Sequence, residues 1–196
     1  PHMKRLQERN LVDEKFNCRP DFVEFATRRA IDEGHYDLMV RAVLQEMPSK
    51  KPSRGYYGVD SRDCPFLMRD FRIGIYTHHT EMVLENYRLI TGSRSCQPLV
   101  SVNPFLQVLN DPFDGKWLRG LNLKIRLQAL EVILLHAIEK MEPDQEAIAC
   151  ALDQDFLKAI PKAEKNGFYS LLVTRLLLGG RLKEARHIIK MKDSSG

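Results

Sequence analysis

Residues 166–192 have the sequence NGFYSLLVTRLLLGGRLKEARHIIKMK, and this stretch decides the fold. Apolar residues recur every three or four positions on both sides of the pair Gly179–Gly180, as they do along amphipathic helices. Glycine readily adopts the left-handed conformation that ends a helix, so the pair predicts a short break. Two helices joined by so short a break run antiparallel. Because this hairpin cannot bury both apolar faces alone, the sequence predicts further helices packed against it. The apolar positions are Phe168, Leu171, Leu172, Leu176, Leu178, Leu182, Ala185, Ile188 and Ile189.

The segment from Gly180 to Ala185, GRLKEA, resembles the turn of tetratricopeptide and pentatricopeptide helical hairpins. In those families a small residue five positions after the turn glycine lets the two helices approach closely, and Ala185 occupies that position. Residues 21–47 show a fainter version when Gly34 is aligned with Gly180, although Met39 stands where the small residue belongs. The resemblance implies stacked hairpins, a TPR-like helical repeat, whose concave surface binds a peptide or helix of a partner.

The rest of the chain predicts an all-α fold of about eight helices with no convincing strand. Residues 122–140 are apolar around most of the helix, so we expect this helix to be central and to bury Leu130 and Leu134. Prolines and glycines between residues 48 and 74 predict a long loop. We expect helix or irregular structure at 66–77. The predicted architecture is a set of packed antiparallel helical hairpins, either solenoid-like or an irregular bundle. The remaining predicted helices cover residues 4–17, 80–90, 105–109, 144–152 and 153–165, the last one short or kinked at Pro161.

Composition describes an ordinary globular chain. Hydrophobic residues make up 43% of the 196 residues and charged residues 29%, which argues against disorder. Residues 1–3, Pro-His-Met, resemble a cloning and tag remnant, so we expect one domain over residues 4–196 excised from a larger protein. No stretch approaches the ~18 apolar residues of a membrane span, so no membrane partner is expected.

The four cysteines are scattered and show no C-x-x-C spacing. We therefore expect reduced thiols in an intracellular protein of the cytoplasm or nucleus, because disulfides are rare in those compartments. The cysteines are Cys18, Cys64, Cys96 and Cys150.

The sequence shows no glycine-rich phosphate loop, no nucleophile elbow and no metal-ligand spacing. His78 and His79 stand next to each other before Glu81, but adjacent side chains point about 100° apart on a helix, which favours a polar helix start over a metal site. Arg181 and His187 resemble the R-x4-6-H signature of HEPN ribonucleases, where the arginine would steady phosphate and the histidine would handle protons. That family usually has a polar residue after the arginine, whereas Leu182 follows it here. We expect that the chain is not an enzyme and binds no metal or cofactor. A HEPN-like ribonuclease is the alternative.

A basic and aromatic cluster lies in the predicted loop. Cations beside aromatic rings can hold single-stranded nucleic acid, and the net charge of +4 permits such contact. The interpretation that we favour is a solvated loop whose tyrosines pack on the core. We expect the chain to be a protein–protein interaction scaffold that binds a peptide or helix of another protein, with an RNA-binding helical module as the alternative. The candidate nucleic-acid or partner contacts are Lys50, Lys51, Arg54, Tyr56 and Tyr57.

Replacing Lys50, Lys51 and Arg54 together with alanine should leave partner binding largely intact, because an apolar contact with a protein segment barely depends on loop cations. Affinity for the purified partner should also change little between about 50 and 200 mM salt, whereas a complex with several phosphate contacts loses affinity steeply over that range. Loss of a tight, salt-sensitive RNA complex in the triple variant would instead make this loop the binding site.

Overall fold

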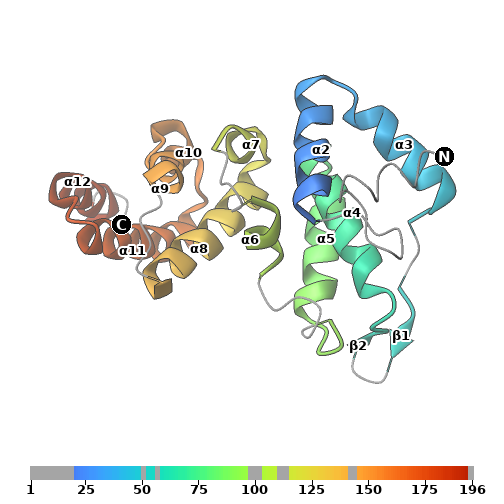
Figure 1. The fold of residues 1–196 in the computed structure, drawn as a ribbon. Helices are drawn as coiled ribbons and strands as arrows, with labels where there is room; N and C mark the ends of the chain where they lie inside the picture. Colours follow the sequence, from blue (N-terminus) through green and yellow to red (C-terminus); the bar gives the residue numbers. More distant parts are fainter. Residues whose placement is uncertain are drawn as a thin grey trace. The chain divides into compact units, whose positions relative to one another are not determined.

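The structure, a computed structural model, describes residues 20–49, 52–55, 58–96, 103–109, 115–140 and 145–193. The chain groups into two compact units, residues 1–50 and 51–196, where the sequence predicted one domain over residues 4–196. The helix predicted at 4–17 and Cys18 lie outside the described residues. Within those residues the fold is all-α, as predicted, with eleven helices and only one pair of very short strands (Figure 1).

The first unit contains a helix pair, as the pattern at 21–47 predicted. Helix α2 spans Pro20–Asp32 and α3 spans Tyr36–Glu46. The backbone turns at Gly34, whose N–H donates to the carbonyl of Ile31, and the N–H of His35 donates to Ala30. The predicted pairing of two helices around Gly34 is therefore confirmed.

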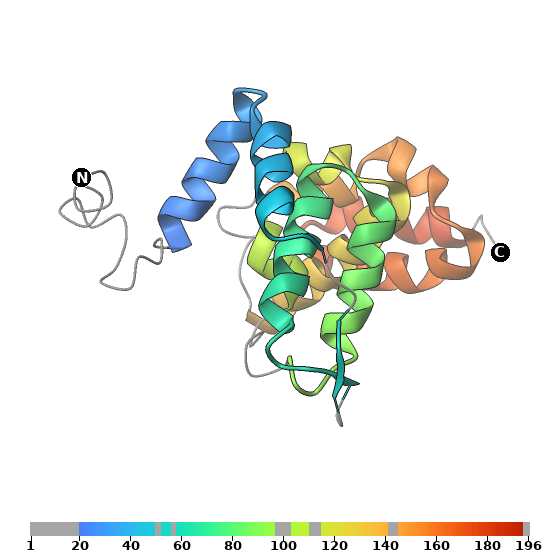
Figure 2. The same ribbon diagram turned by 90° about the vertical axis from the view of Figure 1, so that its right-hand side faces the viewer.

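The first two helices of the second unit are α4, Cys64–Tyr76, and α5, Thr80–Thr91, which form a hairpin and lie side by side (Figure 2). The loop predicted over 48–74 was therefore too long. Pro65 lies in the first turn of α4, where its missing N–H costs nothing. Gly74 is a packing glycine, because a Cβ there would come within 2.9 Å of the Val83 Cγ2 atom on α5. The helical alternative for 66–77 is confirmed, and so is the helix predicted at 80–90.

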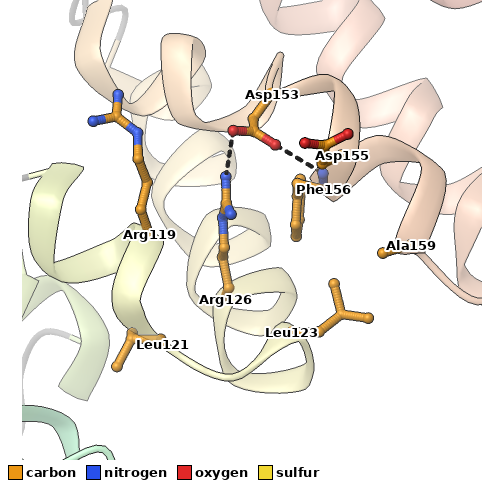
Figure 3. A pocket seen from close by; sticks show the side chains of 8 residues that line it. All are labelled: Arg119, Leu121, Leu123, Arg126, Asp153, Asp155, Phe156 and Ala159. Atoms are coloured by element: carbon orange, nitrogen blue, oxygen red, sulfur yellow. Dashed lines mark hydrogen bonds and ion pairs between the residues drawn. The ribbon is translucent and has the colours of Figure 1, made fainter.

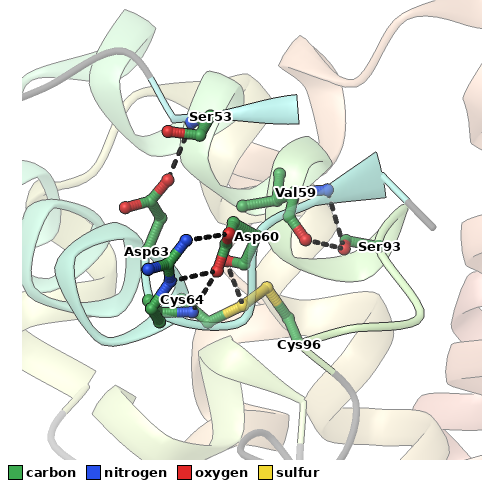
Figure 4. The surroundings of a disulfide bond; sticks show 8 residues. Ser53, Val59, Asp60, Asp63, Cys64, Ser93 and Cys96 are labelled. Atoms are coloured by element: carbon green, nitrogen blue, oxygen red, sulfur yellow. Dashed lines mark hydrogen bonds and ion pairs between the residues drawn. A yellow bond between two sulfur atoms is a disulfide. The ribbon is translucent and has the colours of Figure 1, made fainter. Parts of the chain in front are cut away.

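A two-stranded ribbon and a disulfide close the open end of this hairpin. Strands β1, Arg54–Gly55, and β2, Gly58–Val59, pair antiparallel, a small departure from the prediction of no strand. The Val59 N–H donates to the Ser93 hydroxyl at 3.1 Å, which ties β2 to the end of α5 (Figure 4). Cys64 and Cys96 are both fully buried and form a disulfide with a Cα–Cα distance of 5.5 Å. The expectation of reduced thiols is therefore wrong for this pair, whereas Cys150 is buried and takes no part in a disulfide.

Seven further helices complete the second unit. The sequence missed α7, because its first three residues belong to the turn-rich segment DPFDGKW and the helix includes two glycines. Pro161 separates α10 from α11 rather than kinking one helix, and it stands at the N-cap of α11. The helices are α6, Pro104–Leu109; α7, Gly115–Gly120; α8, Leu123–Lys140; α9, Gln145–Ala151; α10, Gln154–Ala159; α11, Lys162–Leu178; and α12, Leu182–Asp193.

Helix α8 is the centre of this unit. It packs against α5, α6, α7, α9 and α11, so neighbours cover it on several sides. Leu130 and Leu134 are 0% exposed, as the sequence predicted for a helix with little polar face. Ile125, Leu127 and Ile133 are buried with them. The central position predicted for residues 122–140 is therefore confirmed, whereas a solenoid-like stacking of the hairpins stays a prediction.

Leu134→Ala should lower the free energy of unfolding by about 2–5 kcal/mol, because it removes buried methyl groups and leaves a cavity in a tightly packed core. Leu135 is the matched control, since this neighbouring side chain is 50% exposed and its replacement by alanine should cost about 0.5 kcal/mol or less. Denaturant titration of both variants measures the difference. Equal losses would show that α8 is not buried on the Leu134 side in solution.

Removing the disulfide should also destabilise the second unit. The chain-entropy relation for a bridge between residues 32 positions apart gives about 3–4 kcal/mol for the double variant Cys64→Ser, Cys96→Ser. Tryptic digestion without reductant should yield residues 63–69 covalently linked to residues 95–116, and reductant should separate them. Recovery of both peptides as free thiols from unreduced protein would contradict the bridge.

Candidate functional site

The hairpin of α11 and α12 has a well-defined turn and a buried inner face. Gly180 adopts a positive φ of 70°, and the Arg181 N–H donates to the Leu176 carbonyl at 2.8 Å, so the end of α11 is closed by backbone hydrogen bonds. Phe168, Tyr169 and Leu172 on α11 are fully buried. Because the turn and the inner face are both fixed, the outer face of the hairpin is held in one conformation.

Apolar side chains that the core does not use gather on this hairpin. Leu177 and Leu178, at the end of α11, are 49% and 50% exposed; Leu182 and Ile189, on α12, are 55% and 41% exposed. These four residues, called the hairpin surface below, are four of the ten exposed large apolar residues in the described part of the chain. Grouped exposed apolar residues mark interaction sites more often than scattered ones do. The hairpin surface is therefore our leading candidate site.

Ala185 explains why Leu182 and Ile189 face outward. Ala185 and Ile188 are the buried residues of α12, at 1% and 0% exposure, and α12 packs directly on α11. Leu182 and Ile189 are seven positions apart, which is two helical turns and about 10 Å along one face. The face that they share is therefore turned away from α11. A small residue at 185 agrees with the hairpin prediction, while kinship with the repeat families stays a prediction.

The spacing that resembles the ribonuclease signature joins Arg181 and His187, and these two residues lie in different environments. The Arg181 guanidinium donates to the Glu184 carboxylate at 2.9 and 3.0 Å and to the Gln145 side chain at 3.4 Å. The same hydrogen bonds hold the pKa of Glu184 below its usual value. His187 is exposed and, six positions along the helix, points about 120° around from Arg181. The arginine is therefore engaged with acceptors of α9 and α12, and the ribonuclease pair stays a prediction.

Most of the candidate contact residues in the predicted loop lie outside the residues that the structure describes. Lys50, Lys51, Tyr56 and Tyr57 lie outside the described residues, and of Arg54 the structure describes the backbone alone, in β1. Their role as nucleic-acid or partner contacts is therefore still a prediction.

The histidine pair has a structural role at the α4–α5 turn. His79 is the N-cap of α5, and its Nδ1 atom accepts from the Met82 N–H at 3.2 Å. His78 has a φ of 56°, and its ring lies so close to Gly120 that a Cβ there would come within 2.9 Å of Cε1. The interpretation as a polar helix start is therefore confirmed for His79. The described residues contain no group of three histidine, cysteine or acidic side chains that could hold a metal ion.

A second candidate site, not foreseen from the sequence, is an open cavity of about 410 Å³ beside α8 and α10 (Figure 3). The Arg126 guanidinium lies over the ring of Phe156 at 4.3 Å, donates to the Cys150 carbonyl at 2.9 Å and pairs with Asp153 at 3.8 Å. Burial lowers the pKa of Arg126, against the attraction of Asp153. Because Asp153 also caps α10 through the Phe156 N–H, this cluster joins α8, α9 and α10.

The sequence held a weak indication of this cluster. Arg126 lies between two apolar residues of the most apolar helix, and Asp153 precedes a helical segment as a capping residue would. Nothing local, however, could show that residues 27 positions apart would meet. Arg119 and Asp155, at the same cavity, are both exposed and carry opposite charges, so its lining favours neither an anion nor a cation.

None of the described helices is long and apolar enough to cross a membrane. Compared with known proteins, the chain matches no family model, no curated protein sequence and no solved structure.

Proposed function

We propose that this chain is a protein–protein interaction module that binds a peptide or helix of a partner on the α11–α12 hairpin. The observation that carries the proposal is the exposure of four aliphatic side chains on the α11–α12 hairpin, namely Leu177, Leu178, Leu182 and Ile189.

The hairpin surface suits the recognition of a protein segment. Amphipathic helices dock through apolar residues that repeat every three, four or seven positions, and Leu182 and Ile189 offer a matching pair. A preformed surface loses little conformational entropy on binding. The hydrogen-bonded turn at Gly180 and the buried Tyr169, whose hydroxyl donates to the Leu157 carbonyl at 3.2 Å, supply that rigidity.

RNA binding and HEPN-like cleavage are the alternatives. Single-stranded RNA is held by aromatic stacking together with cations, and the hairpin surface has aliphatic residues in place of aromatic rings. The ribonuclease alternative needs the Arg181 side chain that Glu184 already engages. We therefore favour a protein partner. An intracellular setting remains part of the proposal, and the Cys64–Cys96 disulfide is the observation that weighs against it.

The test removes the apolar character of the hairpin surface and keeps the helices. In the triple variant Leu178→Gln, Leu182→Gln, Ile189→Gln each residue is replaced by a good helix former. The matched control is Phe66→Gln, which changes an apolar side chain of α4 that is 46% exposed. Proteins captured by the immobilised wild-type chain from nuclease-treated extracts should be captured equally by the control and at least tenfold less by the triple variant, because buried anchors dominate binding energy.

Circular dichroism must show that both variants keep their helical spectrum. Specific protein capture that the triple variant retains in full would contradict the proposal, as would capture that nuclease treatment abolishes.

A further inference from the structure

The outer face of α12 carries positive charge beside its apolar residues. Arg186 lies between Leu182 and Ile189 on the same face, four positions after the first and three before the second. A neighbouring row of the helix contains Lys183, His187 and Lys190. These three basic residues and Arg186 are all exposed.

The acidic residue within this stretch is already neutralised. The Glu184 carboxylate forms an ion pair with Arg181 at 2.9 Å. Among the described side chains of α12, cations therefore outnumber acids on the face that Leu182 and Ile189 share. Lys183 and Arg186 therefore place positive charge beside the apolar pair.

We propose that the occupant of the hairpin surface is an acidic amphipathic helix of another protein. Its apolar residues would pack on Leu182 and Ile189, and its carboxylates would face Lys183 and Arg186. Two apolar contacts about 10 Å apart match positions i and i+7 of a partner helix that runs along α12. This inference rests on the proposed function and adds the partner's charge and secondary structure to it.

Charge disfavours two other occupants. A second copy of the chain would bring the same basic face against this one, and like charges across an interface are repulsive. The chain's own residues 4–17 carry four cations against three acids, so they offer no net negative charge either. The partner is therefore a different, acidic chain.

A protein partner also agrees better with the exposure of the apolar side chains than a lipid surface does. Helices that lie in a membrane bury their apolar face several ångströms deep in the headgroup region, which requires side chains that protrude freely. Leu177, Leu178, Leu182 and Ile189 are instead about half covered by their own fold. Anionic vesicles and RNA are therefore outcomes of the test.

The test is a selection from a displayed library of helical peptides that have fixed apolar residues at i, i+4 and i+7 and random charges elsewhere. The selection uses the wild-type chain, the charge-reversed variant Lys183→Glu, Arg186→Glu, and the control Lys124→Glu, Lys158→Glu. The control makes the same charge change at exposed positions of α8 and α10. Glutamate at position 183 suits the first turn of a helix, so the reversed variant should fold.

Wild type and control should both enrich peptides rich in aspartate and glutamate, and the reversed variant should enrich basic peptides. An acidic peptide from the wild-type selection should bind the reversed variant at least tenfold more weakly, because the reversed charges repel its carboxylates. The acidic peptide should also compete with natural partners for binding to the wild-type chain.

The outcomes separate the two proposals. Enriched peptides without charge bias that still need Leu182 and Ile189 would overturn the acidic partner and leave the interaction module standing. Failure to enrich any peptide dependent on the hairpin surface would overturn both. A third outcome would assign this face to another ligand. In that case the wild-type chain would bind vesicles containing phosphatidylserine, or single-stranded RNA, and the reversed variant would not. The selection would then enrich no acidic peptides.

Discussion

The burial of α8 is the constraint on which the second unit depends. This helix packs against five others, and its apolar residues therefore face neighbours in several directions. The surroundings of α8 are mostly apolar, so the charged side chain of Arg126 needs partners within the fold. Its guanidinium has a carbonyl, a carboxylate and the face of Phe156 as partners, because an uncompensated charge at this depth would be costly. Through those partners the central helix also fixes the positions of α9 and α10.

The helical periodicity of the sequence was sufficient to predict the fold class and most helices. The sequence-based predictions were wrong where one residue type occurs both in loops and in helices. Pro65 and Gly74 suggested a loop, yet Pro65 lies in the first turn of α4 and Gly74 allows close contact with Val83 on α5. A sequence does not distinguish a glycine that turns the chain from one that lets helices touch. The disulfide was missed because Cys64 and Cys96 lie 32 positions apart, and four cysteines allow three pairings.

The candidate site shows a similar limit. The sequence identified the hairpin, but its periodicity placed Leu176 and Leu178 in one apolar stripe. In the structure Leu176 is fully buried and Leu178 is half exposed, so only packing separates the residue that stabilises the fold from the one available for binding. The positive charge beside it follows from Lys183 and Arg186, which became informative once the outward face of α12 was known. The Arg126 cluster required contacts between distant segments, which local patterns do not encode.

The close packing of α12 on α11 also determines what the outer face can be. Because Ala185 is small and buried, α12 lies near α11 and needs little more than Ala185 and Ile188 to fill its inner side. Leu182 and Ile189 then have no role in that contact, and in water an exposed apolar surface favours non-specific association. The neighbouring cations reduce that tendency, since two like-charged faces repel each other. In the proposed interaction the same cations would attract an acidic chain, so one charge pattern would both discourage self-association and favour such a partner.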